Sequence, residues 1–151
     1  MNILALDLAT KTGWAHSGGG SGVQDFAPRR GDSPGMRWVE FQAWLRRILD
    51  ACPTDVIAYE QAHHRGGAAT HVAHSLIGIV EKVAAERKIE LTNRHTATIK
   101  KYATGKGNAS KEEMMEAAEK AECFDSIDRE FIDDNEVDAL FLLKLVLEEL
   151  R

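Results

Sequence analysis

The sequence predicts an α/β fold, with a mixed β-sheet of about five strands flanked by α-helices. Short runs of branched and apolar residues, such as Ile3–Leu8 and Val56–Tyr59, are typical of strands. Between them lie longer segments, such as Met36–Leu49, in which apolar residues recur at helical spacing. A length of 151 residues fits a single domain, residues 1–151, with a core of its own.

The N-terminal part is predicted to form three strands before the helix Met36–Leu49. Two turns separate these strands, and the second turn is rich in glycine. The predicted strands are Ile3–Leu8, Trp14–His16 and Val23–Phe26, and the turns are Thr10–Gly13 and Ser17–Gly22.

The remainder of the chain is predicted to alternate strands and helices. The strands are Val56–Tyr59 and Ile89–Thr92, the helices are Thr70–Glu86, Thr96–Tyr102, Ser110–Glu122 and Asp134–Leu150, and a loop covers Phe124–Ile132. Ser110 and Glu113 have the spacing of a capping box. The helix Thr70–Glu86 is apolar around most of its girth, which predicts burial on two sides, against its own sheet and against a second subunit.

Composition indicates a soluble protein of the cytoplasm. Cys52 and Cys123 are far apart and fit reduced thiols. Asp7 interrupts the apolar N-terminus, which therefore does not fit a signal peptide. The apolar runs are too short to span a membrane. A net charge of −5 weakly disfavours a nucleic-acid partner. However, the segment from Arg94 to Lys111 carries five basic residues and no acid, so one face could still bind DNA.

Three carboxylates occupy informative positions. Asp7 lies in the first strand, Glu60 closes the strand Val56–Tyr59, and Asp138 lies near the start of the last helix, four residues after Asp134. Asp7 alone could be an exposed residue of an edge strand, and Glu60 alone could be a strand terminus. The helix macrodipole explains an acid such as Asp134 better than Asp138, which lies further into the helix on its core-facing side. If Asp7 and Glu60 lie on neighbouring strands, however, they would point into one crevice, where their crowding would be tolerable only with a hard cation such as Mg²⁺.

Four stretches, in this order, resemble the RuvC family of Holliday-junction resolvases within the ribonuclease H-like superfamily. They are LALDLATKTGWA, VIAYEQAH, IKKYATGKGNASK and DNEVDALFL, and together they span nearly the whole chain. The likeness is to the compact phage or prophage type, so for a phage-encoded protein the compartment would be the bacterial host cytoplasm.

The resemblance implies that Asp7, Glu60 and Asp138 are catalytic ligands of Mg²⁺, with Mn²⁺ as the alternative ion. The family's fourth ligand, an acid or histidine, falls on Asn135, which can offer a carbonyl oxygen, and Asp134 or Glu136 are the alternatives. Lys100 and Lys111 fall on the family's functional lysines, with Lys111 also assigned a catalytic role. The family's aromatic wedge loop reads here as QAHHRGGAATH. DNA contacts are therefore expected from these lysines, from Lys106 in the same basic segment, and from His63, His64 and Arg65.

The resulting prediction is a metal-dependent, structure-selective endonuclease that resolves four-way or other branched DNA, acting as a homodimer with paired phosphodiester hydrolysis and without a membrane partner. In such two-metal hydrolysis, water attacks in line and the metals stabilise both the attacking and the leaving oxygen. Two alternatives stay open. The segment from Asp7 to Gly13 also fits the phosphate loop of actin-like and sugar-kinase-like nucleotide-binding proteins, and the Asn135 departure is compatible with a catalytically inactive junction-binding module.

Overall fold

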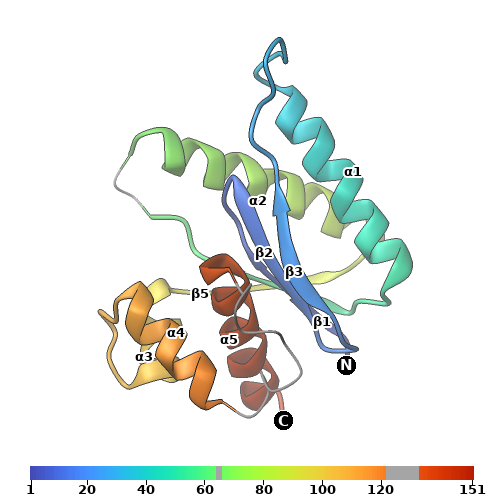
Figure 1. Cartoon of the computed structure of the whole chain (residues 1–151). Helices are drawn as coiled ribbons and strands as arrows, with labels where there is room; N and C mark the ends of the chain where they lie inside the picture. The colour runs from blue at the N-terminus through green and yellow to red at the C-terminus, as the bar shows by residue number, and fades with distance from the viewer. Residues whose placement is uncertain (64–65, 122–132) are drawn as a thin grey trace.

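The computed structural model describes residues 1–63, 66–121 and 133–151, and it contains one five-stranded mixed sheet (Figure 1). The order across the sheet is β3-β2-β1-β4-β5. The strands are β1 (Ile3–Asp7), β2 (Lys11–His16), β3 (Ser21–Asp25), β4 (Val56–Glu60) and β5 (Glu90–Arg94). Strand β2 runs antiparallel to both β1 and β3, whereas β1, β4 and β5 run parallel to one another. The carboxyl ends of β1 and β4 therefore meet at the same edge of the sheet.

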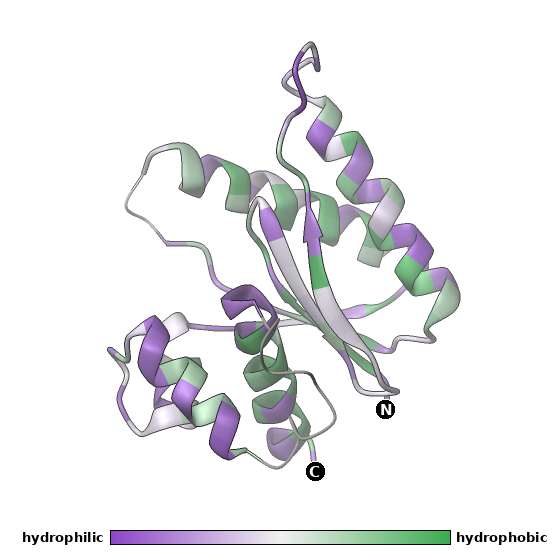
Figure 2. Cartoon of the chain, viewed as in Figure 1, coloured by the Kyte–Doolittle hydropathy of each residue, from purple (hydrophilic) through white to green (hydrophobic). Residues whose placement is uncertain are grey.

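Helices cover both faces of this sheet (Figure 1). Helices α1 (Met36–Ala51) and α2 (Ala68–Arg87) lie on one face, and α5 (Asp134–Glu149) lies on the other with α3 (Thr96–Thr104) and α4 (Lys111–Lys120) beside it. Figure 2 shows α5 as hydrophobic along most of its length after a hydrophilic first turn. The sequence prediction of a mixed sheet with flanking helices is confirmed.

The side chains of the central strand β1 alternate between two hydrophobic cores, one on each face of the sheet. Ile3 and Ala5 pack with α5, whereas Leu4 and Leu6 face α1 and α2. All four are at most 1% exposed, as expected for a strand covered on both faces. Such a strand holds its last residue, Asp7, in a fixed position.

Most of the large apolar side chains of helix α2 are covered by the chain's own core. Val72, Leu76 and Val80 are buried in the core shared with α1, and Ile77 and Ile79 pack against the same core while partly buried. In the described part of the chain, α2 carries none of the large exposed hydrophobic residues, which are Met1, Met36, Val39 and Leu150. Much of the second apolar side predicted for this helix is therefore covered within the chain itself, and a subunit contact there stays a prediction.

Several predicted boundaries differ from the structure. Lys11–Gly13, predicted as a turn, begins β2, and Ser21 and Gly22 belong to β3. Helix α2 begins at Ala68, two residues earlier than predicted. The capping box at Ser110 is confirmed, with the Ser110 hydroxyl accepting from the backbone N–H of Glu113 at 3.1 Å. The loop predicted over Phe124–Ile132 lies outside the described residues, and among those described no helix is long and apolar enough to cross a membrane.

Candidate active site

Asp7 and Glu60 are placed side by side by strand pairing. Asp7 ends β1, and Glu60 ends the neighbouring parallel strand β4, which pairs with β1 from Ile3↔Val56 to Leu6↔Tyr59. Asp7 lies on the central strand of the sheet, so an exposed edge strand does not explain it. The hydroxyl of Thr96 donates a hydrogen bond to the Glu60 carboxylate.

Asp138 comes from the second turn of α5, whose first turn is fixed against the sheet. The N-cap Asp133 accepts from the backbone N–H of Asn135 at 2.8 Å. Gly13 of β2 lies so close that a Cβ built there would be 1.9 Å from the carbonyl oxygen of Asn135. The Ser21 hydroxyl donates to Glu136 at 2.6 Å. Only a glycine at position 13 lets the helix approach this closely, and the approach brings Asp138 over the strand ends.

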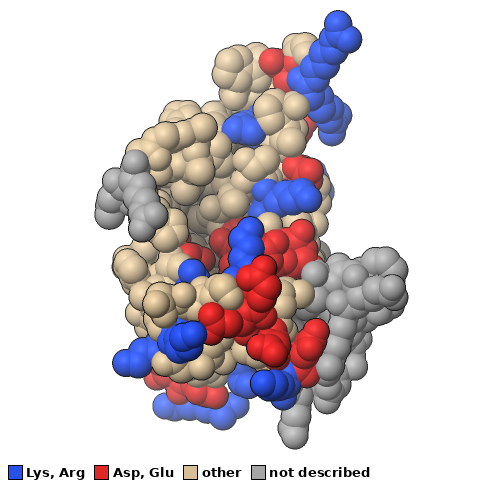
Figure 3. Space-filling view, turned by 60° about the vertical axis from the view of Figure 1, so that its left-hand side comes forward, with Lys and Arg blue, Asp and Glu red and all other residues tan. Residues whose placement is uncertain are grey.

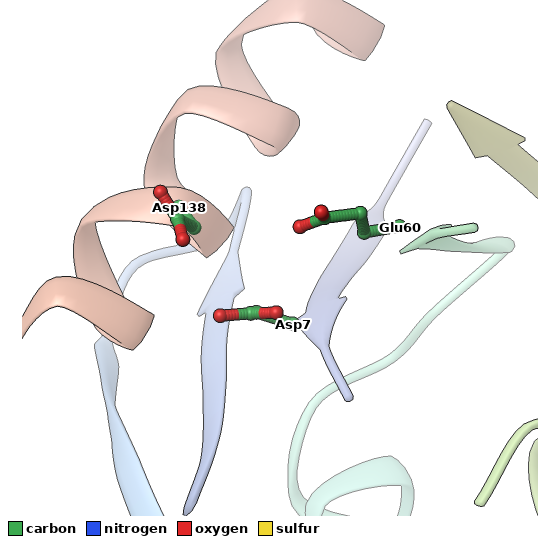
Figure 4. Close-up of side chains that lie close together, drawn as sticks. All are labelled: Asp7, Glu60 and Asp138. Carbon is green, nitrogen blue, oxygen red and sulfur yellow. The ribbon is translucent and has the colours of Figure 1, made fainter. Parts of the chain in front are cut away.

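The three carboxylates converge from three separate elements (Figure 4). One oxygen from each of Asp7, Glu60 and Asp138 lies within 4.8 Å of the others. They line a pocket of about 260 Å³ whose other walls are His63, Thr96, Lys100, Lys111, Met114, Asp134 and Asn135. On the surface seen in Figure 3, acidic and basic side chains lie next to one another near the middle of the view instead of forming separate regions. The structure thus brings the three predicted ligands together.

The crowding of these acids disfavours their ionised forms. Burial raises the pKa of Asp138 from 3.8 to about 7, with Glu60 and Asp134 adding repulsion and Lys100 and Lys111 opposing it. Burial also raises the pKa of Asp7 well above 3.8, and the charges of Glu60 and Asp138 contribute to this shift. Like charges gathered in a partly buried pocket cannot all stay ionised without a compensating cation.

The donor set fits a hard divalent cation. Three carboxylates supply only oxygen atoms, which Mg²⁺ and Mn²⁺ both accept, and the pocket is open enough for water to complete the coordination. A site of this composition is therefore able to hold such an ion.

The candidates for a fourth ligand differ in whether they line the acidic pocket. Asp134 and Asn135 both line the pocket, whereas Glu136 does not line it and instead accepts from Ser21 on β3. Asn135 donates its side-chain N–H to Asp133 at 2.9 Å, and its side-chain carbonyl oxygen is the atom that could bind a cation. Asp134 forms an ion pair with Lys111, at 3.2 Å between Oδ2 and Nζ.

The predicted DNA-binding residues fall into three groups. Lys100, Lys111 and His63 line the acidic pocket, and the hydrogen bond to Asp134 raises the pKa of the Lys111 amino group. Lys106 lies apart from the pocket lining and donates to Glu113 at 2.8 Å. His64 and Arg65 lie outside the described residues.

Two neighbouring hollows extend the concave surface around the acids. One, of about 200 Å³, shares Asp7 and Glu60 and runs toward the start of α2 along Leu8 and Ala73. The other, of about 450 Å³, shares Thr96, Lys100 and His63 with the acidic pocket and reaches His95 and Gly107. The carboxylates thus lie within a wider depression on the surface.

Comparison with solved structures identifies the fold. The structure of RuvC from Thermus thermophilus matches this chain with a TM-score of 0.72 at 18% sequence identity, covering 94% of this chain and 90% of that chain. This chain has the RuvC fold. T. thermophilus RuvC in complex with Holliday junction substrate gives a TM-score of 0.73 at 16% identity, with the same coverage of both chains. No family model and no curated protein matches the sequence.

The sequence analysis did not identify Thr96 as a member of this site. Its hydroxyl contacts Glu60, although 36 residues separate them in the chain. The available signal was positional, because Thr96 follows the strand that pairs with β4 and so returns to the edge where Glu60 ends.

Proposed function

We propose that this chain is a divalent-metal-dependent endonuclease that hydrolyses phosphodiester bonds in branched DNA, four-way junctions among them. The observation that carries the proposal is the meeting of Asp7, Glu60 and Asp138 within 4.8 Å of one another, in a pocket where burial and mutual repulsion disfavour their charges. A structural role does not account for three acids that oppose one another's ionisation.

The three carboxylates would hold the cation, with Asp134 or Asn135 as a further oxygen donor. When bound, divalent cations supply an activated water and neutralise charge that develops on the phosphate oxygens. The chain's own part is to hold the ligands on rigid elements and to place Lys100 and Lys111 at the pocket wall, where their charges can orient a phosphate.

Branched DNA is the proposed substrate because the solved structure of T. thermophilus RuvC in complex with Holliday junction substrate has the same fold. A homodimer would present two such sites and could cut two strands in a paired manner. The proposed contact is the outer side of α2, whose exposed residues include Gly78 and Ala85.

A specific observation counts against the nucleotide-binding alternative. Gly13, which would end the phosphate loop in that interpretation, lies inside strand β2 and packs against the carbonyl of Asn135. The start of α5 therefore occupies the space where a phosphate would have to approach this glycine.

The test is cleavage of a labelled synthetic four-way junction by the full chain, with Mg²⁺ or Mn²⁺ and with a chelator. We expect metal-dependent nicking near the branch point, which the chelator abolishes. Asp7→Asn should abolish cutting while junction binding in a gel-shift assay persists. Glu119→Gln, which neutralises an exposed acid of α4, is the matched control and should cut normally.

Other outcomes would assign the chain differently. Junction binding without cleavage under either metal would favour the inactive binding module, and ATP turnover would favour the nucleotide-binding protein. Unchanged cutting by Asp7→Asn would refute the assignment of the carboxylates.

A further inference from the structure

The Glu60 carboxylate has a hydrogen-bond partner from a neighbouring element, which the proposed function does not itself require. Strand β5 pairs with β4 so that Arg94 lies opposite Glu60, and the backbone N–H of Gln61 donates to the carbonyl of Arg94 at 3.0 Å. The chain then turns into α3, whose first residue is Thr96. This register returns the Thr96 hydroxyl to the end of β4, where it donates to Oε1 of Glu60.

Thr96 is held in place independently of Glu60. His95 caps the start of α3, with its Nδ1 accepting from the backbone N–H of Ala97 at 3.1 Å. Ile99, in the same turn, is only 2% exposed and anchors the helix in the core. A β-branched side chain at such a position has few rotamers to choose from, so its hydroxyl points in a defined direction.

A third side chain lies beside the Thr96 hydroxyl. This hydroxyl donates its single proton to Oε1 of Glu60. The same Thr96 oxygen lies 3.4 Å from Nε2 of His63. Thr96 therefore lies in contact with both His63 and Glu60, and all three line the acidic pocket.

We propose that Thr96 is a positioning residue, which fixes the orientation of the Glu60 carboxylate so that Glu60 can share a cation with Asp7 and Asp138. This inference rests on the proposed metal site. Groups that hydrogen-bond to a ligating carboxylate orient it, and their loss typically weakens metal binding 10- to 100-fold. His63, whose Nε2 lies 3.4 Å from the Thr96 oxygen, is the second contact that holds this hydroxyl.

The test measures cation binding directly, without DNA and without turnover. Mn²⁺ is titrated calorimetrically into the full wild-type chain, Thr96→Val, Thr96→Ser and Thr98→Val. Thr96→Val keeps the shape but removes the hydroxyl, and we expect its Kd for Mn²⁺ to rise about 10-fold or more. Thr96→Ser restores the hydroxyl and should stay close to wild type. Thr98→Val makes the same chemical change at an exposed position of α3 and is the matched control.

The role of His63 is tested by a double-mutant cycle on the same binding constant. His63→Ala should weaken Mn²⁺ binding a few-fold in the wild-type background and have no further effect in Thr96→Val, because the link to Glu60 is already broken there. An equal loss in both backgrounds would show that His63 does not act through Thr96.

The outcomes separate this inference from the proposed function. Wild-type affinity in Thr96→Val, or a loss in Thr96→Ser as large as in Thr96→Val, would overturn the role of Thr96 while leaving the metal site intact. A wild-type chain that binds no Mn²⁺ would overturn both. A chain that binds Mn²⁺ in the expected order of variants but does not cut branched DNA would refute the nuclease proposal alone.

Discussion

Replacing Asp138 with asparagine should stabilise the chain when no divalent cation is bound. In the native fold Asp138 lies in a partly buried pocket, and this burial contributes most to its raised pKa. The charges of Glu60 and Asp134 raise the pKa of Asp138 further. Asparagine has nearly the same shape and no charge, so it removes the repulsion and the cost of burying an ion while the packing of α5 is kept.

The magnitude follows from the pKa of Asp138. It rises from 3.8 to about 7 on folding, a difference of about 3 pKa units, and at roughly 1.4 kcal/mol per unit this amounts to about 4 kcal/mol. Between these two values the native state binds more protons than the unfolded state. The stability of the cation-free chain therefore falls as the pH rises from about 4 to about 7, and it levels off above.

The assay is thermal unfolding with a chelator at pH 5 and pH 8, comparing the wild type with Asp138→Asn and with Glu119→Gln as the control. Since about 1 kcal/mol shifts Tm by roughly 2–4 °C at this chain length, we expect Asp138→Asn to melt about 10 °C higher than wild type at pH 8. The gain should be much smaller at pH 5. Mg²⁺ should raise the Tm of the wild type at pH 8 more than that of the variant.

Equal melting of Asp138→Asn and wild type at pH 8 would refute this reasoning, because it would mean that the acids do not repel one another in solution. A stabilised Glu119→Gln would also contradict it, by showing that removal of any acid relieves the net charge of −5.

Three further predictions follow from the same geometry. Lys111→Met should slow junction cleavage by roughly 10²-fold at saturating DNA, because it removes a charge at the pocket wall. Lys120→Met, which removes an exposed charge at the other end of α4, is the control and should cut at the wild-type rate under the same conditions. Gly13→Ala should destabilise the chain by about 3 kcal/mol in chemical denaturation, because the added Cβ would overlap the Asn135 carbonyl, and a wild-type unfolding midpoint would contradict the close contact of β2 and α5. Gly78→Arg should leave the monomer folded, since the space around this position is open. In sedimentation velocity it should convert a dimer to a monomer, whereas the control Gly78→Ala should not. A Gly78→Arg chain that stays dimeric would place the subunit contact elsewhere.

Much of the site could be predicted because it depends on local pattern and strand order. Asp7 and Glu60 each end an apolar strand, and parallel neighbours end at the same edge, so their meeting needs no knowledge of side-chain packing. Asp138 was predicted from the apolar face of the last helix, which packs on the sheet with Leu142 and Val146 buried. Periodicity and strand ends were sufficient for these three residues.

The features that were missed depend on contacts between distant segments. Lys11–Gly13 has the composition of a turn, but its residues extend into β2 because they pair with β3, as in Lys11↔Asp25 and Gly13↔Val23. Thr96 joins the site only through the pairing of β5 with β4. Neither register can be read from composition, since a threonine that opens a helix has the same local appearance whether or not a carboxylate lies beside it.

The position of Asp138 is the part of the site that depends most on the rest of the fold. Asp7 and Glu60 are fixed by backbone pairing within the sheet, but Asp138 lies on a helix that could slide or rotate. Three contacts of the first turn oppose such movement: the cap at Asp133, the close approach of Asn135 to Gly13, and the hydrogen bond from Ser21 to Glu136. These contacts hold Asp138 against two other acids despite their repulsion. The core of α5 thus contributes the stability that the acidic cluster lacks, and a bound cation would remove the conflict.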